Sequence, residues 1–153
     1  MNNSELVTIL NDLAETCKDG ELGFSQCAGH AVDDELKTAF RQRAADCRAA
    51  ALTLQELVRV HGGHADKSGS LTGALHRGWV GVQSFILDKD EDKVILEACN
   101  RGEAVAKARY VRALAQPLPE NVRLIVQRQY ESLLQSYAGI SALLARYRLR
   151  SEG

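Results

Sequence analysis

A few charged and amide side chains interrupt the apolar helical stripes of this sequence, and these are the residues that could do chemistry. Arg43 lies on the apolar stripe of a predicted helix, which would direct its guanidinium inward. Aligning the predicted helical hairpins by their turns places Glu21 level with Arg43. The same alignment places Glu103 near Glu131, with Gln129 half a turn away. We predict a polar bundle centre of Glu21, Arg43, Glu103 and Gln129, in which Arg43 pairs with Glu21, Glu103 or both.

Three carboxylates permit a second interpretation of this centre. Glu21, Glu97 and Glu103 could line a metal or small-ligand pocket, because carboxylate oxygens suit hard cations such as manganese and also bind iron. We favour a polar network that fills the bundle centre and fixes the helix register, because an unpaired buried carboxylate is costly and Arg43 supplies a partner. We therefore expect no cofactor, with iron or manganese as the alternative. That some of these groups face solvent remains a third possibility, and no catalytic residue is recognisable.

The elements that must position these residues are predicted to be long helices. Apolar residues recur in steps of three and four along most of the chain, and both prolines lie at one turn. Ser4 and then Asp33 or Asp34 are suitable N-caps for the first two helices, and Gly62 and Gly63 end the second. The basic end, residues 146–153, is expected to be frayed. The predicted helices cover residues 4–30, 34–61, 70–87 and 94–114, with a last one from Pro119 onward.

The lengths of the connections predict how the helices are arranged. Short turns make the first two long helices one antiparallel hairpin, and the last two a second hairpin. Between the hairpins lie roughly thirty residues, which is enough chain to cross the length of a bundle even with a short helix in it. We expect one all-α domain over residues 1–153, with two antiparallel hairpins joined by a long crossover that contains a short helix. This is the ferritin-like form of the four-helix bundle.

Four strings carry a family resemblance: LNDLAETCKDGELGF, GSLTGALHRGW, EACNRGEAVAKARY and LPENVRLIVQRQYESL. With them the chain resembles an uncharacterised bacterial family of ferritin-like four-helix-bundle proteins. In the wider superfamily, di-iron sites take one Glu from each of two helices and a Glu-x-x-His pair from each of the other two. This sequence departs from that pattern, since Ala49 stands three residues after Asp46 and Leu134 three after Glu131. All four histidines fall at helix ends, in loops or in the crossover, which argues against a di-iron centre.

Composition and charge exclude several classes of partner. Of the 153 residues 45% are hydrophobic, and the formal net charge of −1 gives no reason to expect nucleic acid. No apolar run approaches the ~20 residues of a membrane span, and the N-terminus lacks the pattern of a secretory signal, so we expect a cytoplasmic protein without a membrane partner. The cysteines have no CxxC spacing, which favours reduced thiols. They are Cys17, Cys27, Cys47 and Cys99.

Two classes of function remain open from the sequence. One is a non-catalytic helical-bundle protein, associated with stress or acting through contacts in a homo-oligomer, for which we expect a homodimer. The alternative is a metal-binding or di-iron oxidase-type protein with an atypical carboxylate-rich site. Whether the protein is an enzyme is left undecided between these two classes.

Overall fold

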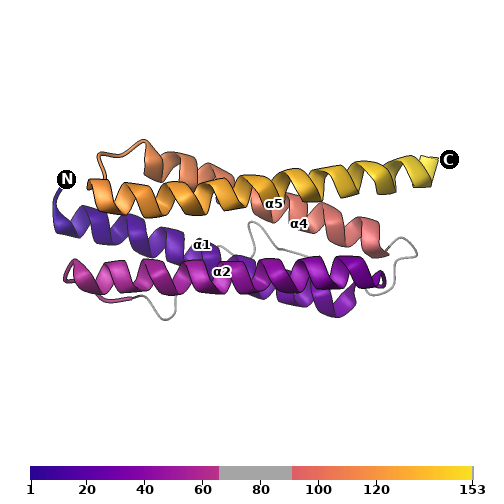
Figure 1. Ribbon diagram of the computed structural model, residues 1–153, viewed down its shortest axis with the longest axis horizontal. Helices are drawn as coiled ribbons and strands as arrows, with labels where there is room; N and C mark the ends of the chain where they lie inside the picture. The colour runs from indigo at the N-terminus through magenta and orange to yellow at the C-terminus, as the bar shows by residue number, and fades with distance from the viewer. Residues whose placement is uncertain (66–90, 153) are drawn as a thin grey trace.

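The computed structural model describes residues 1–65 and 91–152, and within them all regular structure is helical. Two antiparallel hairpins lie against each other along their lengths (Figure 1). The helix predicted over residues 70–87 lies outside the described residues. None of the described helices is long and apolar enough to cross a membrane. The helices are α1 (Asn3–His30), α2 (Asp34–Val60), α4 (Glu91–Leu114) and α5 (Glu120–Glu152).

Side-chain caps fix where the first two helices begin. The N-cap of α1 is Asn2 rather than the predicted Ser4, because the Asn2 side chain accepts a hydrogen bond of 2.8 Å from the backbone N–H of Glu5. Of the two caps predicted for α2, Asp33 is the one that the structure shows, accepting from the N–H of Leu36 at 3.1 Å. A cap of this kind satisfies backbone donors that the first helical turn leaves without partners.

The second hairpin extends further than the sequence predicted. Helix α4 begins at Glu91, ahead of the predicted Val94. Helix α5 runs to Glu152. The prediction that residues 146–153 are frayed is therefore wrong for residues 146–152. Helix α5 continues because Tyr147 packs against the apolar core. The guanidinium of Arg150 lies over the Tyr147 ring, 5.1 Å from its centroid. The last turns of α5 therefore have contacts that hold them helical.

The packing of the helices is uneven. Helix α1 packs along α2 and also against α4, and α4 packs against α5, whereas α2 and α5 meet along much less of their length. At one end of the bundle, Asn11 of α1 donates to the backbone oxygen of His64, just after α2. At the other end, Asp92 of α4 accepts from the N–H groups of Val32 and Asp33. The chain thus leaves α2 at one end of the bundle and begins α4 at the opposite end (Figure 1).

The apolar core consists of two clusters that follow one another along the bundle. The first, the turn cluster, surrounds the α1–α2 turn and contains the two fully buried rings Phe24 and Phe40. The second, the terminal cluster, surrounds the N-terminal half of α1 and contains Leu10, Leu13 and Leu54. Burial of one such side chain contributes about 1.5–3 kcal/mol. The residues of α1 and its C-cap that recur in steps of three and four are all buried: Leu6, Leu10, Leu13, Cys17, Gly20, Phe24, Cys27 and Ala31.

Candidate functional site

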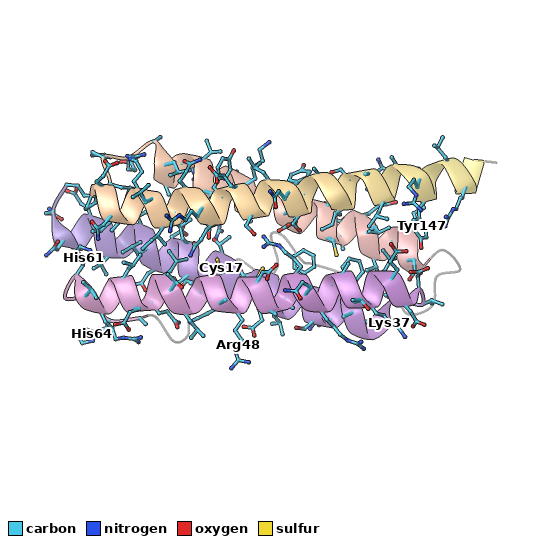
Figure 2. All side chains as sticks on the ribbon, viewed as in Figure 1. Cys17, Lys37, Arg48, His61, His64 and Tyr147 are labelled. Carbon is cyan, nitrogen blue, oxygen red and sulfur yellow. The ribbon has the colours of Figure 1, made fainter. Side chains whose placement is uncertain are left out.

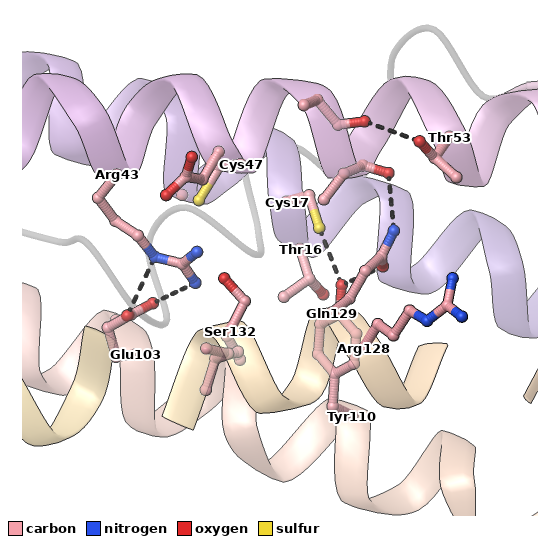
Figure 3. Close-up of a pocket in the computed structure, with 17 residues that line it drawn as sticks. Thr16, Cys17, Arg43, Cys47, Thr53, Glu103, Tyr110, Arg128, Gln129 and Ser132 are labelled. Carbon is pink, nitrogen blue, oxygen red and sulfur yellow. Dashed lines mark hydrogen bonds and ion pairs between the residues drawn. The ribbon is translucent and has the colours of Figure 1, made fainter. Parts of the chain in front are cut away.

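An ion pair lies where the two apolar clusters meet. Nε and Nη2 of Arg43, on α2, donate to the two carboxylate oxygens of Glu103, on α4, each at 3.2 Å (Figure 3). The Arg43 side chain is 12% exposed and that of Glu103 only 3%. Burial works to lower the pKa of Arg43, but the negative charge of Glu103 and its hydrogen bonds to the guanidinium raise the pKa overall, so the guanidinium stays charged. The pair therefore brings two opposite charges into the bundle with both partners satisfied.

A chain of hydrogen bonds beside the ion pair links all four described helices. The hydroxyl of Tyr110, on α4, donates to Oε1 of Gln129, on α5, at 2.8 Å. Because this phenol has one hydrogen, Cys17 of α1 supplies the hydrogen of the 3.1 Å contact between its Sγ and the Tyr110 oxygen. Gln129 in turn donates to the backbone oxygen of Ala50, on α2, at 3.4 Å. The polar groups of this layer thus have partners within the protein.

Burial keeps the thiols and the phenol of this layer protonated. It raises the pKa of Cys17 to about 11 and moves the pKa of Cys47 well above that of an ordinary thiol. The pKa of the Tyr110 phenol is also raised well above its ordinary value, first by burial and then by the neighbouring Cys17. Since the thiolate is the reactive form of cysteine, these groups are poor nucleophiles at neutral pH. All four cysteines of the chain are free and buried.

The polar layer borders a cavity of about 350 Å³. Its lining includes exposed residues of α2 and α5, such as Asp46, Thr53, Arg128 and Ser132, so the cavity opens to solvent between these two helices. These two helices contact each other much less than α1 contacts α2 or α4 contacts α5. The lining is shown in Figure 3 and consists of Thr16, Cys17, Gly20, Arg43, Asp46, Cys47, Ala49, Ala50, Thr53, Gly102, Glu103, Ala106, Tyr110, Arg128, Gln129, Ser132 and Leu133.

The predicted site residues divide into two groups. Arg43, Glu103 and Gln129 all line the cavity, and Arg43 pairs with Glu103. Glu21 and Glu97 do not line it; both are partly exposed, and neither makes a hydrogen bond or ion pair with any other described residue. In residues 1–65 and 91–152 no three His, Cys, Asp or Glu side chains are grouped in a way that could hold a metal ion. The carboxylate set Glu21, Glu97 and Glu103 is therefore not brought together.

The histidines of the described residues lie at the ends of helices. His30 is the last residue of α1, and His61 and His64 follow α2 at one end of the bundle (Figure 2). None of the three lines the cavity. Imidazole ligands for a metal are thus absent from the part of the cavity lining that the structure describes.

Two polar contacts of this region were missed by the sequence reasoning. One is the bond between Cys17 and Tyr110. The other joins the buried Arg109 to the hydroxyl of Thr16 at 2.9 Å, with Asp12 at 3.7 Å as ion-pair partner. The available signal was the position of Thr16 and Cys17 together on α1, where small polar groups can satisfy a buried arginine and a phenol from a facing helix.

A family described as Domain of unknown function (DUF2383) matches residues 5–116 of the chain, which is more than half of it. The chain belongs to this family. The matched region contains α2, α4 and all but the first two residues of α1, with both members of the ion pair. Helix α5, which supplies Arg128 and Gln129 to the cavity, follows it. No curated protein matches the chain.

Proposed function

We propose that this protein is a non-catalytic, ferritin-like helical bundle that binds a small organic molecule in the cavity at its centre. The observation that carries the proposal is the cavity itself, with a volume of about 350 Å³ and an opening between α2 and α5. Pockets for small molecules in proteins have volumes of about 300–1,000 Å³. The direction of the chain, with α2 ending and α4 beginning at opposite ends of the bundle, supports the ferritin-like arrangement.

The lining favours a ligand with an apolar body. Small or apolar groups of Cys17, Cys47, Ala50, Ala106 and Leu133 form much of the wall. The buried polar groups already hydrogen-bond to one another, so they need no polar atom from a ligand. An apolar group that replaces loosely held water in such a site gains free energy.

The chemistry of the interior supports a binding role rather than catalysis. The thiols of Cys17 and Cys47 and the phenol of Tyr110 have raised pKa values and remain protonated at neutral pH. The Glu103 carboxylate is held by Arg43. A metal-binding or di-iron oxidase role would use iron or manganese held by grouped carboxylates and histidines, and the described residues offer no such group.

A pair of matched variants on α4 tests the proposal. Ala106 lines the cavity, whereas Ala108 is exposed on the same helix, and leucine keeps a high helix propensity at both positions. We expect 2-naphthalenemethanol to raise the melting temperature of the parent protein and of Ala108→Leu with increasing concentration, and to have no such effect on Ala106→Leu. Circular dichroism checks that both variants are folded. Equal binding by the two variants, or no binding by the parent, would contradict the proposal.

A further inference from the structure

We infer that the molecule bound in this cavity carries one anionic group, and that Arg128 at the opening recognises it. The inference rests on the proposed function and adds the chemical class of the ligand, a small organic carboxylate or a similar anion with an apolar body. Four charged side chains line the cavity, namely Arg43, Asp46, Glu103 and Arg128. The hydrogen bonds and ion pairs of these four side chains show which of the charges can still bind a ligand.

The two charges inside the cavity offset each other. Arg43 and Glu103 are joined by two hydrogen bonds of 3.2 Å, and both side chains are nearly buried. A ligand that displaced either partner would leave an unpaired charge in the bundle, which is strongly unfavourable. The interior therefore selects an uncharged, largely apolar part of a ligand.

The two charges at the opening differ in their partners. Asp46, on α2, accepts a hydrogen bond of 3.0 Å from Nε2 of Gln42 on the same helix. Arg128, on α5, makes no hydrogen bond or ion pair among the described residues. Its nearest acidic neighbour along the helix, Glu131, accepts from Gln127 instead, at 3.4 Å. Arg128 is thus a cation at the opening of the cavity whose donors are not used by any residue of the two described ranges.

The position of Arg128 suits a ligand that reaches the interior. Figure 3 shows its side chain in the space between α5 and the facing helices, near Gln129 and Tyr110, with the Arg43–Glu103 pair farther along the cavity. A guanidinium binds a carboxylate through two parallel hydrogen bonds, which fixes the orientation of the bound group. With its anionic group at Arg128, a ligand would direct its apolar body toward Cys17 and Leu133.

Two probes with the same rings and different charge test the inference. We expect the parent to bind 2-naphthoate about threefold to tenfold more tightly than 2-naphthalenemethanol in isothermal titration, as befits one charge-assisted contact at a partly solvated site. Arg128→Gln should remove this difference by weakening the binding of naphthoate while leaving the binding of the alcohol unchanged. Arg128→Lys should restore part of it, since lysine keeps the charge without the planar fork.

Matched controls separate this effect from a general change in surface charge. Arg148→Gln, at an exposed position near the end of α5, should leave the binding of both probes as in the parent. Asp46→Asn should strengthen the binding of naphthoate, because it removes a negative charge from the opening. Both changes leave the apolar wall of the cavity intact.

The outcomes distinguish the inference from the proposed function. The inference is wrong if Arg128→Gln binds each probe as tightly as the parent does, or if the parent binds the alcohol more tightly than naphthoate. In either case the proposed binding function stands. If the parent binds neither probe, the proposed function fails and the inference fails with it. A loss of naphthoate binding in Arg148→Gln equal to that in Arg128→Gln would also overturn the role of Arg128.

Discussion

At the scale of single residues, the pair of Arg43 and Glu103 matters most, because it brings charge between the turn cluster and the terminal cluster. Its formation followed from the position of Arg43 on the apolar stripe of α2. The prediction that Glu21 also lies in the polar centre was wrong. Glu21 comes directly after Gly20, whose position is buried, and one residue along a helix turns the side chain by about 100°. Such a step leaves Glu21 partly exposed.

Loss of one partner of this pair should destabilise the protein strongly. Arg43→Ala leaves a buried carboxylate without a partner and should lower the free energy of unfolding by roughly 3–5 kcal/mol in urea titrations. Replacing Arg43 and Glu103 together should cost less than the sum of the two single changes. As a control, Arg59→Ala breaks an ion pair with Glu56 in which the side chains are 58% and 64% exposed, and should cost less than about 1 kcal/mol. Equal losses in Arg43→Ala and Arg59→Ala would contradict this expectation.

The raised pKa of Cys17 predicts how stability depends on pH. Its pKa rises from 9.0 to about 11 on folding, so the folded state holds a proton that the unfolded state releases. The stabilisation from this thiol is complete below pH 9 and is lost as pH rises to about 11. Cys17→Ala should therefore show a shallower loss of stability between these pH values than the parent, by up to about 2–3 kcal/mol. Parallel pH profiles of the two proteins in urea unfolding would show the expectation wrong.

At the scale of the elements, apolar periodicity predicted the long helices, and the errors fall at their ends. The period of a stripe depends on the sequence alone, whereas an end depends on which side chain caps the first turn or which core residue holds the last one. At the start of α1, the side chain of Asn2 and not that of Ser4 caps the first turn. At the end of α5, packing of Tyr147 against the core lets the helix continue to Glu152.

One contact between the two hairpins should stabilise the α1–α2 turn. The carboxylate of Asp92 accepts from the backbone N–H of Val32 at 2.8 Å and of Asp33 at 3.0 Å. Asp92→Ala removes both acceptors and should lower the free energy of unfolding by about 1–3 kcal/mol. Amide hydrogen exchange at Val32 and Asp33 should become faster. Asp34→Ala is the control, since the one contact of Asp34 within the described part of the chain is exposed and lies at 4.0 Å from Lys37. Unchanged exchange in Asp92→Ala would refute the role of Asp92.

At the scale of the whole molecule, the pairing of helices into two hairpins followed from the lengths of the connections. The cavity did not, because its volume depends on how far apart α2 and α5 lie, and small shifts of packed helices change that distance without changing any apolar stripe. The same limit applies to the hydrogen bond between Cys17 and Tyr110, which depends on how far α1 is shifted along its axis relative to α4. The sequence thus indicated that Arg43, Glu103 and Gln129 face the centre but wrongly included Glu21, and the structure was needed to show the space between these residues.

We also propose that two copies of the chain form a homodimer. Helices α4 and α5 expose apolar side chains on their outer faces, among them Val111 at 47% and Leu124 at 52%. Burial of such groups between two copies would stabilise a symmetric pair. Light scattering should give the mass of a dimer, and Leu124→Glu should shift the protein toward the monomer. A monomer alone at high protein concentration would exclude the proposal.

The binding of a small molecule at the bundle centre is tested most directly by nuclear magnetic resonance of protein with ¹³C-labelled methyl groups. Nuclear Overhauser effects report protons that lie within a few ångströms of one another, so they locate the probe without a variant. For bound 2-naphthoate we predict such effects between its ring protons and the methyl groups of Ala50, Ala106 and Leu133, which line the cavity. Effects confined to exposed methyl groups, such as those of Val60 and Leu149, would contradict binding at the bundle centre.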